Sequence, residues 1–358
     1  MTRRTVAFFG SSLVSAYWNG AATYYRGVIR ALHDRGYAVT FYEPDAYGRQ
    51  AHPDIADPEW AKVVVYPADR PGVERVLDQA RTADIVVKTS GVGVFDRLLE
   101  QAVLDVKAPG ALAIFWDVDA PATLDRLQAD AADPFHPLIP RYDLILTYGG
   151  GDPVVRAYTA AGARRCVPIY NALDTSTHFP APPDPRFSAS LGFLGNRLPD
   201  RERRVEQFFL DAAARLPDQT FVMGGNGWDD KPLPANVRYV GHVYTRDHNA
   251  FNCTPQAVLN ISRDSMARYG FSPATRVFEA AGAAACLVTD TWEGIDQFLE
   301  PGGEVLVASS GEEVADHLRS LTPDRAKAIG TAARRRVCAQ HTYAHRAAQL
   351  QGVLEGAA

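Results

Sequence analysis

The stretch Ser272-Pro-Ala-Thr-Arg276-Val-Phe-Glu279-Ala-Ala-Gly282 is followed directly by the apolar run Ala283-Ala-Ala-Cys-Leu-Val-Thr289. We interpret the first part as a helix that carries an Arg and a Glu, Gly282 as a turn, and the second part as a buried strand. Helix, turn and strand in this order are typical of parallel α/β sheets. The stretch therefore predicts an α/β fold in which a charged helix lies beside a parallel strand.

Short apolar runs alternate with amphipathic stretches along the rest of the chain, as expected for repeated α/β units. In the first half we expect strands at 5–9, 38–42, 63–66, 84–88, 112–116, 143–147 and 166–170. In the second half we expect strands at 191–194, 220–223, 237–240, 257–261, 286–289 and 304–307, followed by helices at about 324–339 and 343–354. Asn19 is expected to cap the first helix, and Gly36 to end it in a left-handed conformation.

The strand pattern breaks once and then restarts, which indicates two domains. Residues 179–186 contain four prolines in eight positions, a density that excludes both helix and inner strand. We therefore expect a Rossmann-like domain over 1–180, a second over 187–335, and a C-terminal helix in 336–358 that crosses back to the first domain. Two such domains would face each other across a cleft, with ligands bound at the carboxyl ends of the strands.

Composition narrows the functional classes. The formal net charge of −5 over 358 residues argues against a nucleic-acid-binding protein. Four separated cysteines provide no CxxC pair for zinc and no secreted disulfide framework, so a cytoplasmic location is expected. Gly10 interrupts the first apolar run too early for a signal peptide, and no run reaches the ~18–20 apolar residues of a membrane span.

A carboxylate at the position of Glu279 is well placed to accept hydrogen bonds from the two hydroxyls of a ribose. In that interpretation Glu279 binds the diol, while Arg276 and Thr275 on the same helix contribute to nucleotide binding. The simpler interpretation is an Arg–Glu pair three residues apart on a helix surface, which contributes only ~0.2–0.5 kcal/mol and is common. The residues alone leave both open.

Two loops at predicted strand ends resemble anion sites. The loop from Arg263 to Ser272 offers backbone amides at a helix start, and Arg263 is within reach of a diphosphate. Gly195 and Asn196 end the first strand of the second domain, where a glycine lets phosphate approach the backbone. The helix that follows is expected to be capped by Asp200 and to present Arg204 to a leaving diphosphate. For the loop from Arg263 to Ser272, the alternative interpretation is a solvated polar loop. The chain has no GxGxxG fingerprint that would support a nicotinamide cofactor.

The backbone at Val243 is a candidate for reading the edge of a nucleobase, with Tyr244 packed on the ring. A lone aromatic residue at the start of a loop is, however, more often ordinary packing. This assignment therefore stays one of two open interpretations.

The first domain has its own candidate residues. Asp117 and Asp119 follow a predicted strand, and either one is a candidate general base toward an acceptor hydroxyl. The same Asp-x-Asp pattern is compatible with a divalent cation site or with a simple turn before a proline. Ser11, Asn19 and Gly20 form a small-residue loop expected on the acceptor and sugar side.

Several motifs together resemble a known group, the spore maturation protein CgeB-like glycosyltransferases, which belong with the two-domain GT-B enzymes. The resemblance covers essentially the whole chain and is strongest from Leu191 onward. The motifs are Phe115-Trp-Asp-Val-Asp-Ala-Pro121, Gly224-Gly-Asn-Gly-Trp228, Leu259-Asn-Ile-Ser-Arg263, Gly270-Phe-Ser-Pro-Ala-Thr-Arg-Val-Phe-Glu279-Ala-Ala-Gly282, Trp292-Glu-Gly294 and His341-Thr-Tyr343.

The resemblance implies transfer of a sugar from a nucleotide donor, with uridine as the base by analogy, held by the second domain, to an acceptor held by the first. It implies that no metal is needed and that Glu279 binds the donor ribose. Retaining members place a second Glu eight residues earlier, where this chain has Phe271, so the stereochemical outcome and the donor sugar stay open. Arg263, Arg204 and the amides near Ser272 would stabilise the leaving diphosphate.

Two other functions fit the same architecture. A non-hydrolysing nucleotide-sugar epimerase would convert the donor without any acceptor. A catalytically inactive, glycosyltransferase-like binding protein would be unaffected by loss of Glu279. The identity of the acceptor and the oligomeric state are outside what the sequence indicates.

Overall fold

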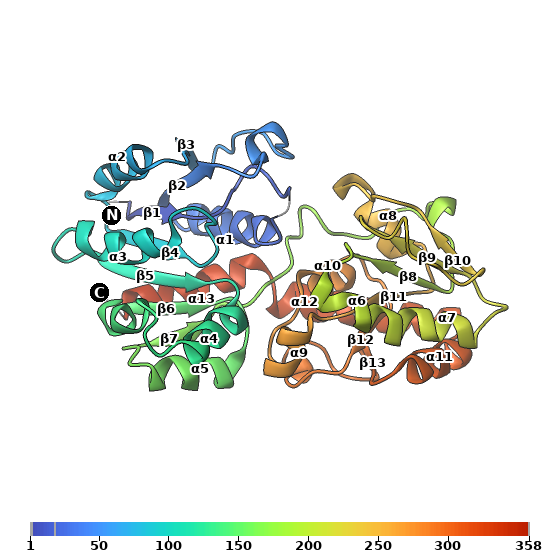
Figure 1. Ribbon diagram of the computed structural model, residues 1–358. Coiled ribbons are helices and arrows are strands. Elements are labelled where there is room, and N and C mark those ends of the chain that lie inside the picture. Colours follow the sequence, from blue (N-terminus) through green and yellow to red (C-terminus); the bar gives the residue numbers. More distant parts are fainter. Residues whose placement is uncertain (1–2, 18, 357–358) are drawn as a thin grey trace. The chain divides into compact units, whose positions relative to one another are not determined.

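The computed structural model describes residues 3–17 and 19–356 and divides into two compact units (Figure 1). Unit 1 comprises Met1–Asn171 and Tyr343–Ala358, and unit 2 comprises Ala172–Thr342. The proline-rich segment 179–186 therefore lies inside unit 2. Residues 1–2 of the first predicted domain and residues 357–358 of the predicted C-terminal segment lie outside the described residues.

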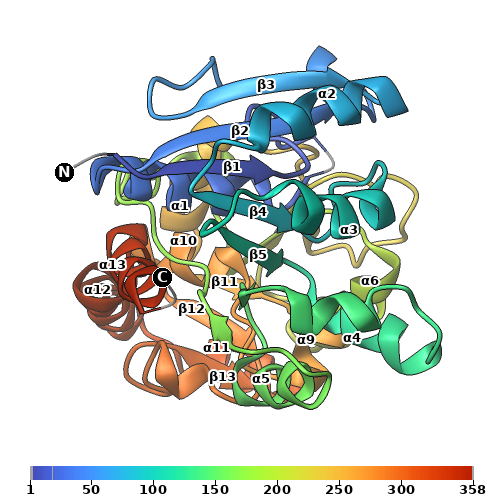
Figure 2. The same cartoon turned by 90° about the vertical axis from the view of Figure 1, so that its left-hand side faces the viewer.

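Unit 1 is built on a seven-stranded parallel sheet with strand order β3-β2-β1-β4-β5-β6-β7 (Figure 2). The strands are β1 (Thr5–Phe9), β2 (Ala38–Asp45), β3 (Lys62–Pro67), β4 (Ile85–Thr89), β5 (Leu112–Asp117), β6 (Leu144–Thr147) and β7 (Cys166–Pro168). Each lies within a few residues of its predicted range, because buried parallel strands form near-continuous apolar runs. The strand order reverses between β1 and β4, which marks the topological switch point of this sheet.

Helices cover both faces of the first sheet. They are α1 (Ala22–Asp34), α2 (Arg70–Ala80), α3 (Asp96–Val106), α4 (Ala120–Ala129), α5 (Gly151–Ala160) and α13 (Tyr343–Glu355). Helix α1 packs against α13 on one face, while α2 to α5 cover the other (Figure 2). Gly36 ends α1 at φ +90°, as predicted.

The predicted cap of α1 is wrong. The structure places Ala21 at the N-cap, with no side-chain hydrogen bond. The Asn19 amide instead donates to the carbonyl oxygens of Ser12 and Ser15 at 2.9 and 3.1 Å. Asn19 therefore stabilises the loop before the helix rather than the helix itself, because its short amide satisfies nearby loop carbonyls first.

The C-terminal helix α13 belongs to unit 1, so the chain end returns to the first unit as expected from the sequence. A Cβ added at Gly27 in α1 would lie 2.2 Å from the ring of Tyr343. The absence of a side chain at Gly27 thus allows the two helices to approach closely.

Unit 2 contains a six-stranded parallel sheet with strand order β10-β9-β8-β11-β12-β13. The strands are β8 (Leu191–Leu194), β9 (Phe221–Gly224), β10 (Val237–Tyr239), β11 (Ala257–Asn260), β12 (Leu287–Asp290) and β13 (Leu306–Ala308). The helices are α6 (Pro199–Val205), α7 (Asp211–Arg215), α8 (His248–Cys253), α9 (Asp264–Tyr269), α10 (Thr275–Gly282), α11 (Gly311–Ser320) and α12 (Pro323–Gln340), and a π-turn over Glu206–Leu210 joins α6 to α7.

Side chains alternate between the two faces of this sheet. In β8, Phe193 packs into the core that contains Phe209 and Val314, while Leu194 packs on the opposite face with Phe251. This period of two is what a strand buried on both faces requires. The order reverses between β8 and β11, and this second switch point is where the charged residues of unit 2 gather.

Helix α10, which contains Glu279, begins later than predicted. The sequence predicted a start at Ser272, but the first helical residue is Thr275, and Ala274 is the extended N-cap. Phe271 has φ +45° and precedes this turn, and the residue before Pro273 is restricted away from helical angles. Within the described part of the chain, no helix is both long and apolar enough to cross a bilayer.

Candidate functional site

Glycines bring two strand ends of unit 2 into close contact at the switch point. The amide of Gly195, just after β8, donates to the carbonyl oxygen of Gly224 at 3.0 Å. Gly225 has φ +119°, and a Cβ there would lie 2.2 Å from the Gly195 oxygen. Only glycine permits this approach, so the ends of β8 and β9 lie closer together than a side chain would allow.

Three guanidinium groups gather beside this turn: Arg201 from α6, Arg263 after β11, and Arg276 from α10. We call them the arginine cluster. Burial lowers the pKa of Arg201 to about 10, and the positive charge of Arg276 adds to the effect. The Arg201 Nε and Arg276 Nη1 atoms are buried and have no hydrogen-bond partner among the described residues. Buried nitrogen donors that lack acceptors, on two cations placed close together, indicate a site that an anion completes.

Arg201 lies on the same predicted helix as Arg204, which the sequence favoured as the diphosphate ligand, and it is held firmly. Its Nη2 donates to the Asn196 carbonyl oxygen, and its guanidinium carbon lies 5.9 Å from the Phe193 ring centroid. A Cβ at Gly195 would lie 2.9 Å from Arg201 Nη2. The glycine therefore makes room for the guanidinium as well as for the turn.

Two predicted phosphate ligands already have carboxylate partners. Arg204 Nη2 lies 2.6 Å from Asp290 Oδ2, and that carboxylate is fully buried. Arg263 Nε donates to Asp200 Oδ2 at 2.5 Å. Asp200 is consequently not the cap of α6, as predicted; Leu198 occupies that position without a side-chain bond.

The remaining predicted residues of this loop have local roles. The Ser272 hydroxyl donates to the Gly270 carbonyl oxygen at 2.8 Å, which closes the turn before α10. Thr275 is the first residue of α10, so the backbone amides that start the helix come from Thr275 onward and not from Ser272. The Asn196 side chain accepts a hydrogen bond from the Asn226 amide at 2.9 Å.

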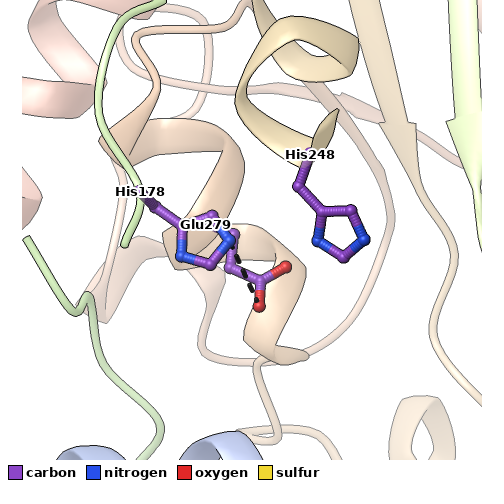
Figure 3. A group of neighbouring side chains, drawn as sticks. All are labelled: His178, His248 and Glu279. Atoms are coloured by element: carbon purple, nitrogen blue, oxygen red, sulfur yellow. Dashed lines mark ion pairs between the residues drawn. The ribbon is translucent and has the colours of Figure 1, made fainter. Parts of the chain in front are cut away.

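Glu279 lies one turn further along α10, largely buried, among three basic side chains (Figure 3). Its carboxylate oxygens lie 3.8 Å from His178 Nε2 and 3.9 Å from Arg276 Nη2. Burial raises the pKa of Glu279, but electrostatic interaction with His178 and Arg276, and least with His248, outweighs it, so the net pKa is lowered. The carboxylate is ionised at neutral pH and can accept hydrogen bonds from a ligand.

His178 and His248 are residues that sequence reasoning missed. Their ring nitrogens and a Glu279 oxygen lie within 4.8 Å of one another. His178 comes from the segment before the proline-rich stretch and His248 from α8, so nothing local in the sequence connects them with α10. Leu173 and His178 approach α10 closely at Gly282, where an added Cβ would lie 2.3 Å from a Leu173 methyl carbon. A larger side chain would clash at this contact, which explains why the stretch 272–282 ends in a glycine.

Val243 and Tyr244 border a different hollow of unit 2. A cavity of about 310 Å³ is lined by both residues together with Arg186, Arg238 and Arg246. None of the arginine cluster lines it, and neither does Glu279. The Val243 carbonyl oxygen faces His248, whereas the Tyr244 ring is more than half exposed.

The two candidate bases of unit 1 differ sharply in environment. Asp117 is fully buried and accepts hydrogen bonds from Tyr158 Oη at 2.5 Å, Thr123 Oγ1 at 3.1 Å and the Asp119 amide at 3.0 Å. These bonds indicate a structural role for Asp117, contrary to the expectation of a general base. Asp119 is the N-cap of α4 and is partly accessible, so it remains the candidate.

The predicted acceptor-side loop is internally bonded. Ser11 Oγ donates to Asn19 Oδ1 at 3.0 Å, and both residues are buried. Gly20 is exposed, and nothing lies within 4 Å of the position a Cβ would take. Of these three residues, only Gly20 presents backbone to the surroundings of unit 1.

Comparison with known proteins agrees with this architecture. Residues 201–352 match the family model described as glycosyl transferase-like. The sequence matches no curated protein at a significant level.

Solved structures share the whole fold at low identity. HepE from Anabaena, in complex with UDP and glucose, aligns with a TM-score of 0.70 at 14% identity over 99% of this chain and 100% of its own. Sucrose-phosphate synthase from Thermosynechococcus elongatus aligns with a TM-score of 0.71 at 13% identity over 99% of both chains. The T4 phage protein BGT, in complex with its UDP-glucose substrate, aligns with a TM-score of 0.59 at 12% identity over 99% of both chains.

These likenesses establish the fold, and the family match covers the part of the chain that carries the arginine cluster and Glu279. The chain thus has the two-domain Rossmann-like GT-B fold, and its residues 201–352 are similar to the glycosyl transferase-like family.

Proposed function

We propose that this protein is a glycosyltransferase that moves a sugar from a UDP-linked donor to an acceptor hydroxyl. The observation that carries the proposal is the carboxyl edge of the unit 2 sheet. There, Arg201 Nε and Arg276 Nη1, which have no hydrogen-bond partner among the described residues, lie on the same side as an ionised carboxylate on α10. A nucleoside diphosphate has the matching chemistry, namely an anionic diphosphate and a ribose diol.

In this proposal Arg201 and Arg276 bind the diphosphate, and Arg263 adds positive charge at the end of β11. As the bond from the anomeric carbon to the diphosphate oxygen breaks, negative charge grows on that oxygen. Fixed cations in a buried site stabilise such charge strongly, because no solvent has to reorganise. The arginine cluster thereby takes the role that a divalent cation has in other transferases, which is why we propose transfer without a metal.

On the acceptor side we propose Asp119 as the general base. The acceptor oxygen forms the new bond to the anomeric carbon, and its proton passes to the Asp119 carboxylate. Gly20 offers exposed backbone on unit 1 for acceptor or sugar contacts. The more specific assignment to the CgeB-like group rests on the motif resemblance, and the assignment of uridine rests on analogy with structures such as HepE with UDP.

The test is thermal unfolding of the full chain with a panel of nucleoside diphosphates and nucleotide sugars. A ligand at a hundredfold its Kd stabilises the native state by ~2.7 kcal/mol, which should raise Tm by roughly 5–10 °C for a unit of this size. We expect UDP and UDP-sugars to produce this shift and Glu279→Ala to abolish it. Glu312→Ala is the matched control, because Glu312 is an exposed carboxylate at the start of α11.

Different outcomes separate the rivals. No shift with any nucleotide would reject the proposal in favour of an inactive homologue. Conversion of a UDP-sugar to its epimer without any acceptor would favour the epimerase instead.

A further inference from the structure

His248 has a defined protonation pattern. Its Nε2 lies 3.3 Å from the Val243 carbonyl oxygen. A carbonyl oxygen only accepts hydrogen bonds, so Nε2 must carry the proton and Nδ1 must present its lone pair. Burial, together with the positive charge of Arg276, lowers the pKa of His248 to about 4. The ring is therefore neutral at physiological pH, and Nδ1 is an acceptor.

The Nδ1 acceptor is directed toward Glu279 and lacks a partner. Nδ1 of His248 is buried and has no hydrogen-bond partner among the described residues. Figure 3 shows the His248 ring and the Glu279 carboxylate side by side, one from α8 and the other from α10. Two buried acceptors placed together require a ligand that brings two donors.

His178 lies on the other side of the carboxylate and is fixed in place. Asn249 donates to the Thr177 carbonyl oxygen at 2.9 Å and accepts from the Phe179 amide at 3.3 Å, so it holds the backbone on both sides of His178. The Nδ1 atom of His178 lies 2.9 Å from Thr177 Oγ1. Its Nε2 is thereby directed toward Glu279, as the dashed line in Figure 3 shows.

Two imidazoles and a carboxylate also form a familiar set of metal ligands, but Arg276 opposes a cation here. Its guanidinium lies 3.9 Å from Glu279, and its charge already disfavours a single proton on His248. A divalent ion at the same place would meet twice that repulsion. A pair of neutral hydroxyl donors meets none of it.

We propose that His248 Nδ1 accepts a hydrogen bond from one ribose hydroxyl while Glu279 accepts from the other, so that the site selects ribonucleotides over deoxyribonucleotides. This inference rests on the proposed function and adds to it a residue that determines specificity. A nucleotide lacking the hydroxyl at His248 leaves the buried nitrogen unpaired, which weakens its binding.

The experiment compares UDP, 2′-deoxy-UDP and 3′-deoxy-UDP by calorimetric titration of the full chain. We expect the wild type to bind UDP about tenfold more tightly than the analogue that lacks the hydroxyl at His248. In His248→Ala that preference should fall below about twofold, while the preference over the other analogue persists, because Glu279 is intact. His248→Asn should restore the preference, since its amide oxygen is an acceptor close to the position of Nδ1.

The remaining outcomes would each overturn the inference about His248. Unchanged preferences in His248→Ala, or equal weakening of all three ligands, would overturn the inference and leave His248 a packing role. Stoichiometric retention of Zn²⁺ by the wild type, lost in His248→Ala, would overturn it in favour of a metal site. If the wild type binds UDP and both analogues equally, only this inference fails; if it binds no UDP, the proposed function fails as well.

Discussion

The charged groups that we compare at the carboxyl edges of the two sheets differ in how completely their own unit pairs them. In unit 1, Asp117 accepts three hydrogen bonds from its own unit, and Lys88 donates to Thr89 and to Asp96. In unit 2, Arg201, Arg276 and the two histidines each keep a buried polar atom that has no hydrogen-bond partner in the described part of the chain. Both sheets follow the same topology with a switch point, so the fold does not cause this difference. Unsatisfied buried polar groups cost stability, and unit 2 retains them where a ligand can satisfy them.

The largest expected effect is a loss of stability in unit 1, where Asp117 is fully hydrogen-bonded at the carboxyl edge of the sheet. Asp117→Ala removes the shared acceptor of Tyr158 and Thr123 and leaves both hydroxyls buried. We expect a loss of about 3 kcal/mol in the stability of unit 1, visible as a lower Tm, with the Kd of UDP unchanged. If stability hardly changed, the contrast between a structural and a functional edge would be lost. Asp125→Ala, an exposed change in the neighbouring α4, serves as the control.

The next effect is a pH dependence located in unit 2. The folded-state pKa of His248 is about 4, below its ordinary value of 6.5, so the unfolded chain binds more protons between these values. Stability therefore falls as pH falls through this window, by up to about 3 kcal/mol, and is fully present above pH 6.5. Unfolding of wild type and His248→Asn from pH 4 to 7 should show the extra loss only in the wild type. His242→Asn, in the preceding exposed loop, should behave as the wild type does.

A smaller effect separates binding from stability. Arg276→Met removes a buried guanidinium whose 3.9 Å contact with Glu279 is its only ion pair among the described residues. We expect the Kd of UDP to rise about 30-fold, because a charge-assisted hydrogen bond contributes ~2 kcal/mol. The Tm without ligand should stay level or rise, since a desolvated cation is removed. A fall in Tm together with an unchanged Kd of UDP would show that Arg276 stabilises the fold and does not bind the nucleotide. The control is Arg203→Met, on the exposed side of α6.

The smallest effect concerns the positioning of His178. Asn249→Ala removes the two hydrogen bonds that hold the backbone around this residue. The residue is half-buried, so we expect a cost of about 1 kcal/mol in stability and about a threefold rise in the Kd of UDP. Hydrogen exchange at the Phe179 amide should become faster. Unchanged exchange would show that other contacts fix this segment.

The sequence predicted the fold well for a physical reason. Strands such as 5–9 and 191–194 are buried on both faces, so their apolar runs are continuous, and their turns contain Gly or Pro. The start of α10 was less predictable, because the left-handed Phe271 and its contact with the Glu293 carbonyl oxygen arise from tertiary structure. The role of Asn19 was misjudged for a similar reason, since its choice of partner depends on the folded loop.

The candidate site was predictable only where its residues share a local motif. Glu279 and Arg276 lie on one helix beside a strand, and the structure brings them together in a buried position. His178 and His248 come from two other segments, and no periodicity connects them with α10. Arg204 was selected because its chemistry suits a phosphate, whereas the fold gives it Asp290 as a partner. Residue type indicates the chemistry, but only the topology shows which charges are already neutralised.

The return of α13 to unit 1 has a consequence for protein synthesis. The ribosome makes residues 3–171 of unit 1 before unit 2, but the face of α1 that receives Tyr343 stays uncovered until α13 is translated. At ~5–20 residues per second, the intervening unit takes on the order of ten to thirty seconds to make. Unit 2 is continuous in sequence and can fold during that time. Unit 1 begins to form before unit 2 but is completed after it, and the α1 face that waits for α13 is the surface that a nascent-chain chaperone would have to protect.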